Sequence, residues 1–241
     1  MLVEDSFIFL PIPRCATVSF ESSLLEQGFK VKYYGNDLVN RRIDKGQFPI
    51  FHSHHTITDL RKLKPEVNQL REIECVSIYR EPVDRFISAW KYVLKNIKDV
   101  DENSYVTLKD IDNESFIKRM DSIISTPFDL SKYSTFDKFL GPFIGYDITN
   151  NPKFNNSRRV FEAVLTPPSR WHENDVTIRY FDIKHLESLE KYVKEMTNKD
   201  FKMNRVNDTH DIETSLVLND DLKDFYFRKI EIPQKTQKSI I

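Results

Sequence analysis

The N-terminal run Phe7-Ile8-Phe9-Leu10 is wholly apolar, and Pro11 and Pro13 end it before a helical pattern begins. An uninterrupted apolar run of this length is typical of a strand that is buried on both faces, as in a parallel sheet. The segment 74–79 has the same character and also leads into a helical pattern, over about 83–96. Buried strands that alternate with helices predict an α/β fold with a central, mainly parallel sheet flanked by helices.

The length of 241 residues suits a single α/β domain with one sizeable core, and we expect that domain to span 1–232. Within it, the segment 125–175 loses its periodicity and is punctuated by prolines and asparagines. A long irregular segment in a compact domain is typical of a loop that binds substrate. We expect the tail 233–241 to be flexible.

The charges nearly cancel, with 36 lysines and arginines against 37 aspartates and glutamates. This balance argues against nucleic acid or an anionic membrane as a partner, so any anion site must be local. Two cysteines cannot form a disulfide framework, and the sequence has neither a secretory signal nor an apolar span long enough for a membrane. We therefore expect a cytoplasmic protein, and its few alanines indicate an AT-rich microbial or viral genome.

The first candidate anion site is the turn between the N-terminal strand and the helix that begins at Thr17. A helix N-terminus presents N–H groups and partial positive charge, and Arg14, Thr17 and Ser19 add donors beside it. The alternative is an ordinary strand–helix turn with a threonine cap. The chain has only five glycines and no Walker motif, which argues against hydrolysis of ATP or GTP.

The second candidate segment follows the strand 74–79, where Arg80 lies at the carboxyl end and Arg85 and Ser88 lie on the next helix. Ligands of open α/β sheets bind beyond the carboxyl ends of the strands, so Arg80 and the first turn are expected to meet at one edge. The alternative is that Arg80 and Arg85 belong to a set of surface ion pairs with neighbouring acids.

The two segments together resemble the nucleotide-binding signatures of sulfotransferases that use 3′-phosphoadenosine 5′-phosphosulfate (PAPS). The family's 5′-phosphosulfate signature, Pro-Lys-x-[Gly/Ala] followed by hydroxyl residues, is similar to the run Pro13–Ser19. The 3′-phosphate signature, Arg-[Asp/Glu]-Pro-x-[Asp/Glu]-Arg-hydrophobic-x-Ser, is matched without a gap by Arg80–Ser88. The resemblance implies a three-layer, P-loop-like form of the α/β fold. The residues that it assigns to PAPS, or to the product adenosine 3′,5′-bisphosphate (PAP), are Arg14, Cys15, Ala16, Thr17, Val18, Ser19, Arg80 and Ser88.

The chain departs from the family's pattern at two positions of the first signature. Arg14 stands where the family has lysine, and a planar guanidinium is not equivalent to an ammonium beside a leaving phosphate. Val18 stands where a hydroxyl residue is common. These departures leave nucleotide binding in place and bring the rate of turnover into question.

The segment Phe48–His54 resembles both the strand of cytosolic sulfotransferases that ends in Thr-His and the His-x-His of uronyl 2-O-sulfotransferases. Both alignments put the catalytic base on His54, and a neutral histidine suits removal of a hydroxyl proton. His52 and Glu21 are the alternative bases. A metal site or a polar loop without chemistry are the other interpretations of the histidines, and the reaction itself needs no metal.

Later segments extend the resemblance over roughly 7–227. Lys202 and Arg205 are basic residues that we expect near the 3′ end of the nucleotide. An anionic acceptor would find three cations and a histidine in the irregular segment, at Arg158, Arg159, Arg170 and His172, and a further histidine at His52. For Lys202, Arg205 and the four residues of the irregular segment, a solvated surface is an equally good interpretation.

The sequence thus predicts an enzyme that moves a sulfuryl group from PAPS to a hydroxyl of an acceptor, expected to be a carbohydrate. The alternatives are a catalytically silent relative that binds PAP or a glycan, and a phosphotransferase. The phosphotransferase is disfavoured by the missing Walker motif.

Overall fold

A computed structural model describes residues 1–32, 73–125, 164, 178–204 and 209–226. The described residues fall into two compact units, and each is treated by itself below. Unit 1 holds 1–32, 73–80 and 178–204, and unit 2 holds 81–125, 164 and 209–226. The expectation of one domain over 1–232 stays a prediction.

In its described part, unit 1 is built on a five-stranded open sheet with the order β3-β1-β2-β4-β5. Its strands are β1 (Leu2–Val3), β2 (Phe7–Phe9), β3 (Val31–Lys32), β4 (Cys75–Tyr79) and β5 (Ile178–Asp182). β2 pairs with β4 and β4 pairs with β5 in parallel, whereas β1 is antiparallel to both β2 and β3. The α/β class is therefore confirmed, but the described strands do not meet the expectation of a mainly parallel sheet, because their sheet is mixed and only partly parallel.

The antiparallel part of the sheet originates in a tight turn at Glu4 and Asp5. Both residues have left-handed backbone, with φ of 48° and 54°, and the Ser6 N–H donates to the Val3 carbonyl at 2.8 Å. Hairpin turns of the primed types need positive φ at their central residues, and glycine or asparagine usually supplies it. Neither is present here, which is why the sequence pattern did not predict the hairpin.

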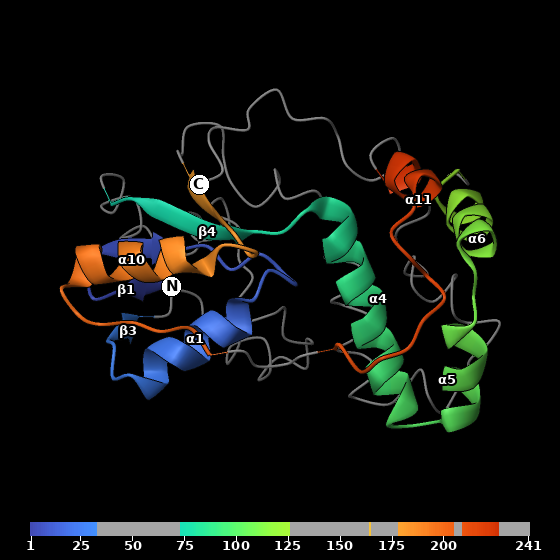
Figure 1. The fold of residues 1–241 in the computed structure, drawn as a ribbon, viewed down its shortest axis with the longest axis horizontal. Helices are drawn as coiled ribbons and strands as arrows, with labels where there is room; N and C mark the ends of the chain where they lie inside the picture. Colours follow the sequence, from blue (N-terminus) through green and yellow to red (C-terminus); the bar gives the residue numbers. More distant parts are fainter. Residues whose placement is uncertain (33–72, 126–163, 165–177, 205–208, 227–241) are drawn as a thin grey trace, which may run out of the picture. The chain divides into compact units, whose positions relative to one another are not determined.

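One face of this sheet is covered by α1 (Thr17–Glu26) and α10 (Leu186–Thr197). Phe7 and Phe9 point to the same face of β2, since side chains alternate along a strand. The Phe9 ring stacks on Phe20 of α1 with 4.2 Å between centroids, and the Phe7 ring meets Tyr192 of α10 edge to face at 5.4 Å. Figure 1 shows both helices alongside the strands of unit 1.

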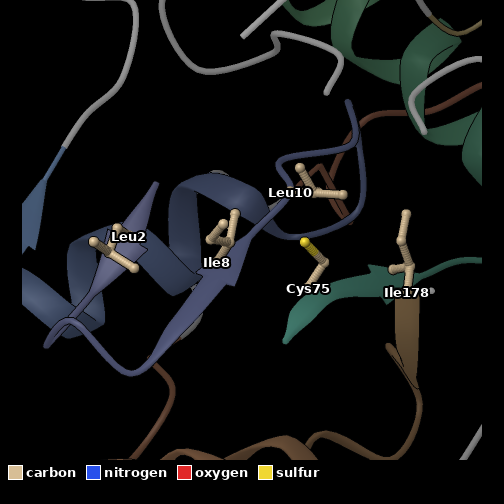
Figure 2. Packing of buried hydrophobic residues seen from close by; sticks show 5 residues of the cluster. All are labelled: Leu2, Ile8, Leu10, Cys75 and Ile178. Carbon is tan, nitrogen blue, oxygen red and sulfur yellow. The ribbon is translucent and has the colours of Figure 1, made fainter. Parts of the chain in front are cut away.

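The opposite face of the sheet carries a second apolar cluster, shown in Figure 2. It comprises Leu2, Ile8, Leu10, Cys75 and Ile178, which come from four adjacent strands and the residue after β2. All five are buried. The continuous apolar run of β2 is explained by this arrangement, because both of its faces are covered by other atoms.

Unit 2 consists, in its described part, of helices (Figure 1). Their bounds are α4 (Pro82–Lys98), α5 (Glu102–Lys109), α6 (Asn113–Ser125) and α11 (Asp220–Phe225). α4 begins at Pro82 because proline suits the first helical position, and the carboxylate of Glu81 accepts from the Asp84 N–H at 2.9 Å. The helical pattern after β4 is thus confirmed and extends slightly further than expected.

The core of unit 2 contains a fully buried arginine on α4. Arg85 donates from Nη2 to the Val164 carbonyl at 2.6 Å, and the Tyr226 hydroxyl donates to the same carbonyl at 3.2 Å. The aromatic residues Phe86 and Trp90 are also fully buried on α4. The interpretation of Arg85 as part of a surface ion-pair set is therefore wrong, and its role is to hold elements of unit 2 together.

None of the helices in the described ranges is both long enough and apolar enough to span a membrane.

The packing of β2 against α1 generates a first prediction. Phe9→Ala should lower the free energy of unfolding by about 3–5 kcal/mol, because it removes a fully buried ring and leaves a cavity. Leu25→Ala on the exposed side of α1, where the leucine is 52% exposed, should change it by less than about 0.5 kcal/mol. Urea titration of both variants tests this, and equal losses would contradict the described face of α1.

Candidate functional site

The two sequence segments singled out above meet at one edge of the sheet in unit 1. β2 and β4 are neighbours and run parallel, with Phe9 opposite Val76 in the register. The carboxyl ends of both strands therefore lie at the same edge. The loop that follows β2 and Arg80, which follows β4, lie at this edge, and so does the end of β5 at Asp182, because β5 runs parallel to β4. The convergence expected from the sequence is present.

The β2–α1 loop, residues 10–16, has an unusual backbone. Arg14 and Ala16 both have left-handed conformation, with φ of 64° and 54°, although neither is glycine. The Cβ atom makes this conformation cost about 1–2 kcal/mol per residue. Strain of this kind persists only where surrounding contacts impose it, and it concentrates at functional sites.

Hydrogen bonds from the body of unit 1 fix two carbonyl groups of this loop. The Ser77 hydroxyl of β4 donates to the Leu10 carbonyl at 2.7 Å. The Thr17 hydroxyl donates to the Ile12 carbonyl at 2.9 Å, and the Cys15 N–H donates to the same oxygen at 3.3 Å. These bonds determine the direction of the chain between the strand and the helix.

A third carbonyl of the loop is bound by the side chain of Arg80. Its Nη1 donates to the Arg14 carbonyl at 3.2 Å, which joins the two predicted segments directly. The Nε atom of Arg80 is buried and has no hydrogen-bond partner among the residues that the structure describes. A buried guanidinium N–H without a partner is costly, and an anion at this edge would satisfy it.

The first turn of α1 opens directly from the loop. Its N-cap position is Ala16, which has no side chain able to cap, and the first turn contains no acidic residue. The N–H groups of Thr17, Val18 and Ser19 precede the first i→i−4 bond of the helix, so a helix start of this kind favours a negatively charged partner. Ser19 is buried, whereas the Val18 side chain is 44% exposed.

Tyr180 of β5 is the register partner of Ser77 in β4. Burial raises the pKa of its hydroxyl above the ordinary value, and the nearby Cys15 thiol acts in the same direction. Cys15 is itself buried. Tyr180 is thus a neutral group near this loop residue. The cations that the two predicted segments bring to this edge are Arg14 and Arg80, and β5 ends there with Asp182, opposite Tyr79.

Lys202 lies in the segment 201–204, which packs along α1 within unit 1. Its ammonium is 2.8 Å from the Glu190 carboxylate, and its backbone exchanges two hydrogen bonds with the Gln27 side chain. The Lys202 side chain is nevertheless largely exposed. Its predicted contact with the nucleotide stays a prediction.

The other predicted site residues are distributed over α1, unit 2 and undescribed segments. Glu21 is half-buried on α1, and Ser88 is buried on α4 in unit 2. Both roles stay predictions. The remaining predicted residues lie outside the described part of the chain: His52, His54, Arg158, Arg159, Arg170, His172 and Arg205.

Ser77 is the residue at this edge that the sequence analysis missed. It is fully buried in β4, and its only signal is a hydroxyl within an otherwise apolar strand. A buried hydroxyl needs a hydrogen-bond partner, so a serine near the end of such a strand indicates a bond to a neighbouring segment.

Comparison with known proteins returns no match to a family model, to a curated protein or to a solved structure. Within the described part of the chain, no group of three or more His, Cys, Asp or Glu side chains is arranged to hold a metal ion.

The left-handed backbone of Ala16 generates a second prediction. Ala16→Gly should raise the free energy of unfolding by up to about 1 kcal/mol, because glycine adopts positive φ without the Cβ clash and this outweighs its greater freedom when unfolded. The matched control is Ala89→Gly in the interior of α4, which should lower it by at least about 1 kcal/mol. Chemical denaturation of both variants is the measurement, and a loss of stability at Ala16 would contradict the described backbone.

Proposed function

We propose that this chain is a PAPS-dependent sulfotransferase that transfers a sulfuryl group to a hydroxyl of an acceptor, and that its α/β fold is of the three-layer, P-loop-like form. The observation that carries the proposal is the hydrogen bond from Arg80 to the Arg14 carbonyl. It links the two segments that resemble the family's two nucleotide signatures, at the sheet edge where α/β proteins bind ligands.

The donor set at this edge fits a nucleotide with phosphate groups at two ends. The start of α1 and Arg14 would hold the 5′-phosphosulfate, since both offer N–H donors and positive charge. Arg80 would hold the 3′-phosphate through its guanidinium, whose buried Nε is without a partner among the described residues. Arg14, Arg80 and the helix start would balance the negative charge of such a ligand locally, although the formal net charge of the chain is -1.

PAPS, when bound, supplies an activated sulfuryl group. The acceptor oxygen forms the new S–O bond while the bond from sulfur to the 5′-phosphate oxygen breaks, and that electron pair remains on the phosphate. Arg14 and the first N–H groups of α1 would stabilise the charge that accumulates there. His54 would accept the proton of the acceptor hydroxyl, with His52 and Glu21 as alternatives. Most of the catalysis then consists of positioning and charge stabilisation.

The acceptor is proposed to be a carbohydrate, because the His-x-His alignment resembles the uronyl 2-O type. Arg158, Arg159, Arg170 and His172 would bind acidic groups of such an acceptor. A cytoplasmic site of action is part of the same proposal.

A catalytically silent relative that binds PAP is the second candidate, and the observation that favours it is Arg14. Arg14 has a guanidinium where the family has the ammonium of a lysine, and the backbone of Arg14 is left-handed. The second candidate shares the nucleotide site with the first and differs only in chemistry.

Titration with PAP tests the nucleotide site. Arg80→Ala should weaken binding by about 10- to 100-fold, because it removes charged hydrogen bonds to a phosphate and releases the loop. Arg179→Ala is the control, since Arg179 lies near the amino end of β5, away from this edge. Calorimetry is the measurement, and ATP should not compete. Absence of PAP binding by the wild-type protein would refute the proposal.

Transfer of labelled sulfate from PAPS to a panel of acceptors separates the enzyme from the silent relative. Acidic glycans should be labelled, and Arg14→Lys should raise the rate at nearly constant PAP affinity, since it restores the ammonium next to the leaving phosphate. Phenols and steroid hydroxyls are the comparison acceptors. If PAP binds but neither protein labels any acceptor, the silent relative is the better description.

A further inference from the structure

We propose that Ser77 and Thr17 are positioning residues of the β2–α1 loop, and that the 5′-phosphate is bound by backbone N–H groups of α1 rather than by the Thr17 hydroxyl. This inference rests on the proposed function and assigns roles within the same site. Neither role follows from the resemblance, which implies a direct contact for Thr17 and does not include Ser77.

The orientation of the Thr17 hydroxyl is determined by its hydrogen bond to the loop. A hydroxyl has one proton, and that of Thr17 is donated to the Ile12 carbonyl at 2.9 Å. An ionised phosphate presents only acceptor oxygens, so this hydroxyl cannot bind it while the bond to Ile12 is made. The residue is 4% exposed, which is consistent with an inward hydroxyl. Its contribution to a ligand is then its N–H at the helix start.

Ser77 makes an equivalent hydrogen bond at the other end of the loop. Ser77 is fully buried, and its hydroxyl donates to the Leu10 carbonyl at 2.7 Å. The ladder continues beside it, with the Leu10 N–H donating to the Val76 carbonyl at 2.8 Å. Ser77 therefore fixes the peptide at which the chain leaves the sheet, and its burial excludes direct contact with a ligand.

The direction of the loop's carbonyl groups determines the electrostatic potential that an anion would meet. Carbonyl oxygens carry partial negative charge and would repel an anion if they were directed at it. The carbonyls of Leu10 and Ile12 are each directed at a hydroxyl donor, and that of Arg14 is directed at Arg80. These three bonds thus turn three carbonyls of the loop toward the protein. The start of α1, with its partial positive charge, is the complementary surface for an anion.

The experiment measures PAP affinity by calorimetry on the full-length chain. Ser77→Ala and Thr17→Val should each weaken binding roughly five- to tenfold, because each removes a hydroxyl donor from a loop carbonyl. Ser77→Ala removes the hydroxyl bond of the Leu10 carbonyl, and Thr17→Val leaves the Ile12 carbonyl with the longer bond from the Cys15 N–H. Thr17→Ser should restore most of the affinity, since it keeps the hydroxyl. The double variant should lose less than the product of the two single losses, because both act on one loop.

Thr197→Val is the matched control. It removes a hydroxyl that donates to a backbone carbonyl, that of Val193 at 2.7 Å, on α10 in the same unit. It should leave PAP affinity unchanged. Circular dichroism and thermal unfolding show whether each variant is folded at the temperature of the titration.

Hydrogen exchange without ligand gives a second, independent measurement. The Cys15 N–H, which bonds to the Ile12 carbonyl, should exchange faster in Ser77→Ala and Thr17→Val than in the wild type or in Thr197→Val. If Thr17→Val weakens binding while Ser77→Ala changes neither affinity nor exchange, Thr17 is a direct ligand and the inference is overturned. If the wild type binds no PAP, the proposed function fails, and exchange alone decides the positioning role.

Discussion

The parallel pairing of β2 with β4 is the constraint on which the rest of unit 1 depends. It places the Leu10 carbonyl within reach of Ser77 and the Arg14 carbonyl within reach of Arg80. A shift of the register by one residue would turn each side chain of β4 to the other face and abolish the bond of Ser77. The shape of the loop is therefore a consequence of strand pairing, to which the loop's own sequence adds two prolines and the first residue of α1 adds a threonine hydroxyl.

Much of this architecture could be predicted from the sequence, because it depends on local apolar pattern. The buried strands β2 and β4 and the helices that follow them were predicted from uninterrupted apolar runs, from Pro11 and Pro82, and from helical periodicity. The alternating pattern over 29–33 does predict a strand at β3, but not its antiparallel pairing with β1. β1 and the hairpin could not be predicted, since a strand of two residues has no period and Glu4 and Asp5 lack the usual signature of a hairpin turn.

The candidate site likewise has a part that could be predicted from the sequence and a part that could not. The convergence of Arg14 and Arg80 could be predicted because strand direction alone determines it. The bond of Thr17 could not, because it depends on backbone angles of Arg14 and Ala16 that side-chain type does not predict. The bond of Ser77 depends on the register of β2 with β4, which the apolar pattern of the two strands does not determine. Arg85 shows the opposite error, since its neighbours in sequence suggested surface charge while tertiary packing buries it.

The absence of glycine from the β2–α1 loop has a consequence for binding kinetics. A glycine-rich phosphate loop is free to move and must be ordered by its ligand, whereas this loop is held by its own hydrogen bonds and by two prolines. A preorganised surface loses little conformational entropy on association. For the proposed nucleotide, diffusion and the local charge of the two arginines would then set the association rate, and the strength of the contacts would set the residence time.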